Sequence, residues 1–144
     1  MVHALKEVWR VLKPGGVLID LRPISVDVPL FILTTTGWKS AGLPDQSPDR
    51  IHDLAANRTI RNVVNDGLFI RLKQEYFDTK YYWKNLKELK SDVENYWKED
   101  IIVSKEIWQH ARLLYTSGSG QRRILFPLRR KLIEYQKRDH KEVD

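Results

Sequence analysis

The sequence of 144 residues predicts an α/β fold, and three observations lead to this prediction. Apolar residues of the first segment have helical spacing, at Ala4, Leu5, Val8, Val11 and Leu12. A Pro-Gly-Gly turn follows, and after it an apolar run from Val17 to Leu21 is typical of a strand covered on both faces in a parallel sheet. In later segments the apolar residues recur either at every second position, as in strands, or with the spacing of a helix. A helix that leads through a tight turn into a buried strand is half of an α/β crossover.

The first helix has a clear end in the sequence. Pro14 cannot donate a backbone hydrogen bond, and it disfavours helical geometry at Lys13. A glycine just beyond the end supplies the left-handed residue on which many helices close. Because polar residues occupy the opposite face, we expect the apolar stripe of this helix to lie on another part of the chain.

After residue 23 the sequence predicts further elements in a regular order. They are a β-hairpin (28–43), a helix that starts at a Ser47 cap and stops at Gly67, a long strand (68–83), two helices within 84–116 and a last strand (121–137). Pro127 indicates a bulge or an edge position in the last strand. We expect residues 1–138 to form a single domain and the polar residues 139–144 to form a frayed tail.

Composition excludes several classes of protein. The chain has no cysteine, which removes disulfides and thiolate metal sites, and its four histidines have no metal-ligand spacing. No window approaches the roughly 18 consecutive apolar residues of a membrane span, and the N-terminus lacks the apolar core of a signal peptide. We therefore expect a cytoplasmic protein without a metal site.

The charge balance leaves two interpretations open. The formal net charge is +6, and the basic surplus gathers near the C-terminus. The residues concerned are Arg122, Arg123, Arg129, Arg130, Lys131, Lys137 and Arg138. They form either a solvated strand face and tail, or a contact surface for an anionic partner.

The run LKEVWRVLKPGGVLIDLRP at residues 5–23 resembles a segment of class I S-adenosylmethionine-dependent methyltransferases. In that family a helix ending in RVLKPGG leads into the fifth strand of a seven-stranded sheet. A helix, the sixth strand and an antiparallel seventh strand that inserts beside it follow. The resemblance therefore implies a partial Rossmann-like sheet with strands five to seven, to which this chain adds the hairpin and two inserted helices.

The same resemblance implies that the chain is a C-terminal, substrate-side fragment. The family holds S-adenosylmethionine mostly through a glycine-rich loop after the first strand, and this sequence has no such loop. No cofactor-binding residue is therefore expected in this chain, and the chain alone is expected to be inactive. The first strand would lack its parallel neighbour, so we expect its exposed edge to pair with the missing N-terminal half or with another partner.

Candidate substrate-side residues follow from their position in the predicted sheet. Ligands of open α/β sheets bind beyond the carboxyl ends of the strands, which here carry Asp20 and Arg22. The hairpin would lie beyond the same end and present Trp38 and Lys39. In the alternative interpretation, Asp20 pairs with Arg22 and the hairpin is only a covering flap. The sequence assigns no catalytic residue.

A function of a different class stays open beside the methyltransferase. The chain would then be a non-catalytic binding or interaction domain for an anionic partner or nucleic acid, using its tryptophans and its arginine and lysine surfaces. Most of the aromatic residues fall at core positions of helices or strands, so they favour neither interpretation.

Overall fold

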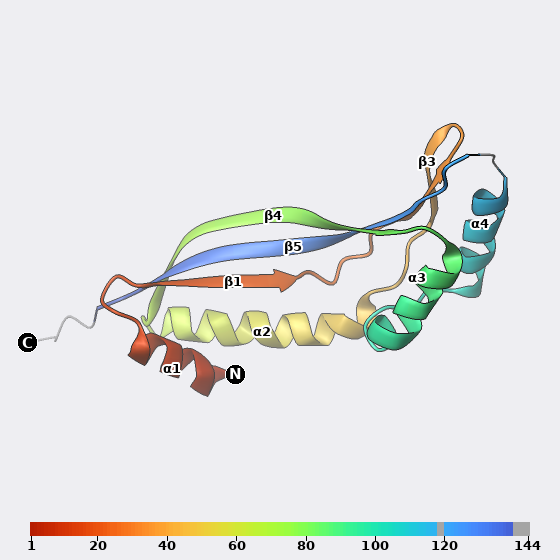
Figure 1. The fold of residues 1–144 in the computed structure, drawn as a ribbon. Helices are drawn as coiled ribbons and strands as arrows, with labels where there is room; N and C mark the ends of the chain where they lie inside the picture. The colour runs from red at the N-terminus through yellow and green to blue at the C-terminus, as the bar shows by residue number, and fades with distance from the viewer. Residues whose placement is uncertain (118–119, 140–144) are drawn as a thin grey trace, which may run out of the picture. The chain divides into compact units, whose positions relative to one another are not determined.

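The computed structural model describes residues 1–117 and 120–139. Figure 1 shows the order of the elements along the chain. They are α1 (Val2–Val11), β1 (Val17–Pro23), β2 (Leu30–Thr34), β3 (Gly37–Gly42), α2 (Ser47–Asn65), β4 (Phe69–Trp83), α3 (Leu86–Asp92), a π-helical segment η1 (Val93–Trp97), α4 (Lys105–Thr116) and β5 (Ile124–Lys137). Of the tail predicted at 139–144, only Asp139 lies within the described residues.

The five strands form one open antiparallel sheet, so the fold is α/β as predicted from the sequence. Its order is β1-β5-β2-β3, and β4 also pairs with β5. Strand β1 pairs with the second half of β5, from Val17 opposite Gln136 to Pro23 opposite Arg130. Strand β2 pairs with β3 and, through Ile32, with the start of β5.

Contacts divide the chain into two compact units. Unit 1 consists of Met1–Pro23, His52–Phe77 and the described residues from Arg130 onward, and unit 2 of Ile24–Ile51 and Asp78–Arg129. Strands β4 and β5 contribute to both units. Each unit has an apolar cluster of its own.

The core of unit 1 lies between the sheet and the helices α1 and α2. Its buried members are Val63, Phe69, Ile133 and Tyr135. Helix α1 packs on this core as expected, but its apolar face differs from the predicted stripe. Trp9 packs against the core, whereas Val11 is 65% exposed. The Lys137 ammonium lies 4.5 Å from the centre of the Trp9 ring, a cation–π contact that fixes this face of the helix.

Turn residues account for the ends of the two helices of unit 1. After α1 the chain becomes extended at Leu12, and Gly15 has a φ of +68°. Helix α2 ends before Gly67, whose φ is +76°. At its start, Ser47 is the first helical residue and not the cap, and its backbone N–H donates to Asp45 Oδ1 at 2.8 Å.

The prediction that β1 is covered on both faces in a parallel sheet is wrong for this chain. Its exposure alternates along the strand, with Val17, Ile19 and Leu21 exposed by 42%, 51% and 56%. Within the described residues the helices of unit 1 cover one face only, and β1 pairs antiparallel with β5. An unbroken apolar run therefore allows a strand to be covered on both faces, but it does not show that both faces are covered.

Strand β5 changes its buried face along its length. Ile124, Phe126 and Leu128 are buried in unit 2, as their alternation predicts, whereas Ile133 and Tyr135 are buried in unit 1. The change occurs because each half of the strand packs against the elements of its own unit.

Proline in β5 does not mark an edge, since this strand has neighbours on both sides. Pro127 lies between Leu125, the last residue paired with β2, and Arg130, the first residue paired with β1. A residue without a backbone N–H is tolerated where the strand changes its partner.

Unit 2 contains the predicted hairpin and the two predicted helical segments, which are confirmed. Strands β2 and β3 pair antiparallel around a two-residue turn. Ser104 Oγ accepts a hydrogen bond from the Ile107 backbone N–H and caps α4, as its sequence predicts. The core of the unit includes an aromatic cluster in which Trp97 meets Tyr81 and Trp83 edge to face, at 5.4 and 5.6 Å between ring centres.

The two faces of β4 differ enough in burial for a direct test. Phe69 is 2% exposed and Leu72 is 51% exposed. We expect Phe69→Ala to lower the free energy of unfolding by about 3–5 kcal/mol, because it opens a cavity in the core of unit 1. Leu72→Ala should lower it by less than about 0.5 kcal/mol. Urea unfolding followed by circular dichroism measures both, and equal losses would contradict the assigned faces of this strand.

Candidate functional site

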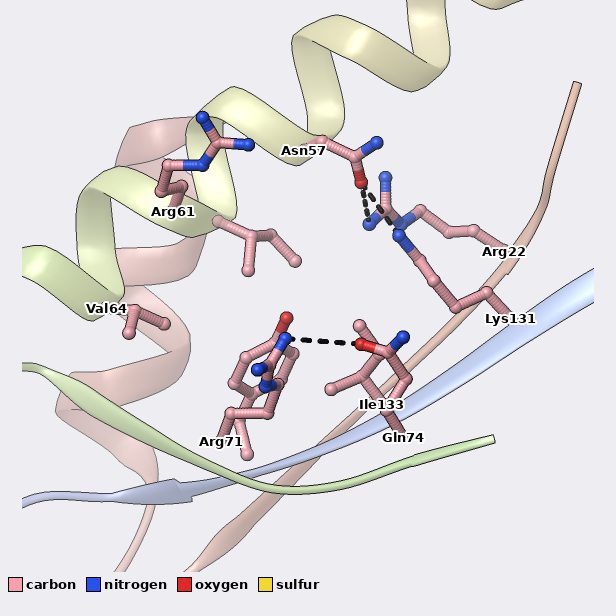
Figure 2. A pocket seen from close by; sticks show the side chains of 10 residues that line it. Arg22, Asn57, Arg61, Val64, Arg71, Gln74, Lys131 and Ile133 are labelled. Carbon is pink, nitrogen blue, oxygen red and sulfur yellow. Dashed lines mark hydrogen bonds between the residues drawn. The ribbon is translucent and has the colours of Figure 1, made fainter. Parts of the chain in front are cut away.

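A cavity of about 510 Å³ lies between α2 and the β1–β5–β4 part of the sheet in unit 1, and we call it the basic cavity. Four of its lining side chains are cationic: Arg22, Arg61, Arg71 and Lys131. Figure 2 shows these groups around the opening, with α2 on one side and the strands on the other. The remaining lining residues are Asn57, Ile60, Val64, Gln74, Ile133 and Tyr135.

The backbone explains why residues so far apart in sequence meet here. Arg22 of β1 stands directly opposite Lys131 of β5 in the strand register. Asn57 and Arg61 are four residues apart on α2, so they lie on the same face of that helix. Arg71 comes from the start of β4. One helix and three strands therefore each supply at least one polar group.

A network of hydrogen bonds holds the inner part of the basic cavity. Arg22 Nε and Nη2 donate to the two carboxylate oxygens of Asp20 at 2.7 and 2.9 Å, a bidentate ion pair. Asn57 Oδ1 accepts from Arg22 Nη2 and from Lys131 Nζ, both at 2.9 Å. Figure 2 shows both bonds converging on this oxygen. The amide thus holds two cations side by side.

The network leaves one strong donor unused. Arg22 Nη1 is buried and has no hydrogen-bond partner among the described residues. A buried donor of a charged group without a partner is unfavourable by about 1–3 kcal/mol or more. Such an atom, beside a cavity, is a position where a bound acceptor would be stabilising.

The environment of the cavity disfavours positive charge on Lys131. Burial lowers the pKa of Lys131, and the neighbouring guanidinium of Arg22 lowers it further. Asp20 and Asp53 act in the opposite direction, without cancelling this effect, and Arg71 adds to the lowering. Burial also raises the pKa of the Tyr135 hydroxyl, with a contribution from Asp20.

Two further arginines lie at the exposed rim of the basic cavity. Arg71 Nη1 donates to Gln74 Oε1 at 3.3 Å. Arg61 makes no hydrogen bond or ion pair within the described part of the chain, and Figure 2 shows its guanidinium on α2, away from the labelled network. Both side chains keep most of their donors for another molecule.

The structure brings together two of the four candidate residues predicted from the sequence. Asp20 and Arg22 pair with each other, as the alternative interpretation has it, and Arg22 also lines the basic cavity. Trp38 and Lys39 lie on β3 in unit 2. Trp38 contacts Tyr82 at 6.5 Å between ring centres, and Lys39 borders a separate hollow near the hairpin turn.

The C-terminal basic run does not act as one group. Lys131 lines the cavity and Lys137 lies on Trp9, both in unit 1. In unit 2, Arg129 pairs with Asp78 at 3.4 Å, and the Arg122 guanidinium lies 5.2 Å from the centre of the Tyr115 ring. These cations therefore make different contacts in the two units, which the number of positive charges in the sequence does not show.

Five of the polar groups that line the cavity are not predicted from the sequence: Asn57, Arg61, Arg71, Gln74 and Tyr135. A signal was present on α2, where the i, i+4, i+7 spacing of Asn57, Arg61 and Val64 marks one face. For Arg71 there was none, because exposed and inward basic residues look alike in an alternating strand.

The other face of unit 1 is apolar and uncovered. It carries Val17, Ile19 and Leu21 of β1, on the side of the strand opposite Leu18 and the core, and we call it the open face. Among the described residues, β5 is the only strand that pairs with β1. An apolar strand edge of this kind is a place where another strand can pair.

Other classes of site find no support within residues 1–117 and 120–139. No group of three or more acidic or histidine side chains there is placed to hold a metal ion. None of the helices described is long and apolar enough to cross a membrane. Comparison with protein families, curated proteins and solved structures finds no match to this chain.

The lowered pKa of Lys131 has a consequence for stability. The folded protein loses this proton below the ordinary pKa of 10.5, so the unfolded chain binds more protons between the two values. The free energy of unfolding of the wild type should therefore rise relative to that of Lys131→Met as the pH increases from the lowered pKa toward 10.5. Chemical unfolding at each pH measures the difference.

The ionisation of Tyr135 needs a control, because its raised pKa has the opposite effect. The unfolded chain loses this proton first, which lowers stability as the pH passes about 10. Measuring both proteins in a Tyr135→Phe background removes the contribution of the tyrosine. A difference that stays constant over this range would contradict the lowered pKa of Lys131.

Proposed function

We propose that this chain forms the fifth to seventh strands of a class I S-adenosylmethionine-dependent methyltransferase domain and carries its substrate side. The observation that supports this most is the position of β5. The last strand of the chain lies between β1 and β4 and runs antiparallel to β1. In the family, an antiparallel seventh strand likewise inserts beside the sixth strand.

The division into units supports the same proposal. Unit 1 contains α1, β1, most of α2, the start of β4 and the end of β5. That is the order of the family around its LKPGG corner, with one helix before the corner and strand, helix, strand, strand after it. The hairpin and the helices α3 and α4, which the minimal family pattern lacks, all belong to unit 2. In the proposed enzyme these additions shape the site of the methyl acceptor.

The open edge of β1 is where the proposal places the cofactor-binding half. Lys137 donates its backbone N–H to Gly16 O, which sets the alternation of hydrogen bonds along this antiparallel pair. Backbone groups of Val17, Ile19 and Leu21 consequently point to the free edge. A parallel strand of the cofactor-binding half would pair there, and its covering helix would lie on the open face.

Methyl transfer requires little covalent help from a protein. The enzyme aligns the sulfonium of the cofactor with a nucleophile, so orientation and exclusion of water are the main contributions. In the proposed enzyme the strand ends and the hairpin orient the acceptor, with Asp20, Arg22, Trp38 and Lys39 as substrate-side candidates. The cofactor itself is held by the other half.

Titration of S-adenosylmethionine tests this proposal. We expect the present chain to show no binding by calorimetry, and a chain extended upstream in the reading frame to bind one equivalent, with a Kd of about 1–100 μM. Failure of the extended chain to bind, or a stop codon directly before Met1 with no glycine-rich loop in any frame, would count against it. Tight and salt-sensitive binding of an oligonucleotide by the present chain would instead favour a nucleic-acid-binding domain.

Substitution on the open face gives a second, structural test. We expect Ile19→Lys to lower the free energy of unfolding of the extended chain by more than about 1 kcal/mol, since a covered lysine is unfavourable. In the present chain the same change should have little effect, because Ile19 is 51% exposed. The matched control is Ile51→Lys, at an exposed position of α2. Equal effects of the two substitutions in the extended chain would contradict covering of the open face.

A further inference from the structure

We propose that the basic cavity binds the phosphate group of a small phosphorylated molecule. This inference does not depend on the methyltransferase proposal, because it rests on the donors, charge and size of the cavity, which lies on the opposite side of the sheet from the open face.

The charge of the cavity fits a dianion. Four cationic side chains line it and no carboxylate does, although Asp20 pairs with Arg22 from beside it. The lining is therefore strongly cationic in a partly enclosed space. A phosphate monoester carries a charge of about −1.5 to −2 at neutral pH, so it is attracted more strongly than a single carboxylate.

The donors of the cavity are also of the type that phosphate requires. Arg22 Nη1 is buried without a partner, and Lys131 Nζ uses one of its three protons on Asn57. The guanidinium groups of Arg61 and Arg71 offer planar pairs of N–H donors at the rim. Phosphate oxygens accept several hydrogen bonds each, so one group can satisfy donors that arrive from α2, β1, β4 and β5.

The size of the cavity indicates a small ligand. About 510 Å³ exceeds the space that a phosphate group fills and lies within the range of pockets for small molecules. Ile60, Val64 and Ile133 supply an apolar part of the wall, against which the rest of such a molecule can pack. A nucleic-acid strand needs a continuous basic surface, whereas Arg122 and Arg129 of the C-terminal run have partners elsewhere.

The titration of Lys131 agrees with this assignment. Its pKa is lowered because burial and nearby cations disfavour its charged form. A bound dianion would reverse this effect and raise the pKa again. Binding is thus expected to be accompanied by proton uptake when the solution pH lies near the pKa of Lys131.

Titration with inorganic phosphate tests the proposal on the full chain. We expect one equivalent to bind with a Kd of about 1 mM or below at low ionic strength, with amide shift changes in NMR spectra confined to the lining residues. Acetate, a monoanion, should bind at least about tenfold more weakly at the same ionic strength. Absence of phosphate binding up to about 50 mM, or equal affinity for acetate, would overturn the assignment.

A matched pair of substitutions on α2 separates a specific site from general attraction. Arg61 lines the cavity and Arg58 does not, although both are exposed residues of the same helix. We expect Arg61→Gln to weaken phosphate binding about tenfold, and Arg58→Gln to change it less than about twofold. Arg71→Gln should resemble Arg61→Gln. Equal effects of the Arg58 and Arg61 substitutions would show surface attraction and overturn the proposal.

Sulfate extends the test to pH, because its charge is constant over the range. Its affinity should fall as the pH rises toward 10.5 and Lys131 loses its proton. Lys131 is faced by Asp20 and Arg22 of β1, Asp53 of α2 and Arg71 of β4. The Tyr135 hydroxyl also lines the cavity, so both proteins carry Tyr135→Phe, and in that background Lys131→Met should abolish the dependence. Persistence of the dependence in Lys131→Met would contradict the role of Lys131.

Discussion

Strand β5 is the element on which both units of this protein depend. It pairs with β1, β2 and β4, so three of the other four strands join the sheet through it. Its first half supplies Ile124 and Phe126 to the core of unit 2, and its second half supplies Ile133 and Tyr135 to the core of unit 1. The last residues to enter the sheet in chain order thus provide its centre, which makes the fold dependent on contacts distant in sequence.

The register of β5 also creates the chemistry of unit 1. Pairing places Lys131 directly opposite Arg22, two cations that repel each other in a partly buried site. Asp20 and the Asn57 amide offset this repulsion, because they accept four hydrogen bonds of 2.7 to 2.9 Å from the two cations. Charged groups of this kind contribute little to stability once their desolvation is counted. A lysine with a lowered pKa beside a cavity is instead typical of a binding site.

The two proposals concern different surfaces of the same small unit. The methyltransferase proposal depends on the strand order and on the open face with Ile19 at its centre, both of which are properties of the backbone and of uncovered apolar area. The phosphate proposal depends on side chains of the covered face, chiefly Arg22 and Lys131. Arg22 is a candidate residue in both proposals, but the observations differ, strand order and an uncovered face for the first and the donors of a cavity for the second, so each proposal can stand or fail without the other.

Local signals in the sequence determined the elements of this fold. Helical spacing, the LKPGG corner, the Ser104 cap and the two-residue hairpin turn act between near neighbours, and the structure confirms the elements they predict. Tertiary structure alone decided which faces are buried. Trp9 and not Val11 packs against the core, and the buried face of β5 changes between Leu128 and Ile133. Both outcomes depend on which elements of the fold pack against the helix and the strand. The basic cavity belongs to this second kind, since only antiparallel pairing of β1 with β5 brings residue 22 to residue 131.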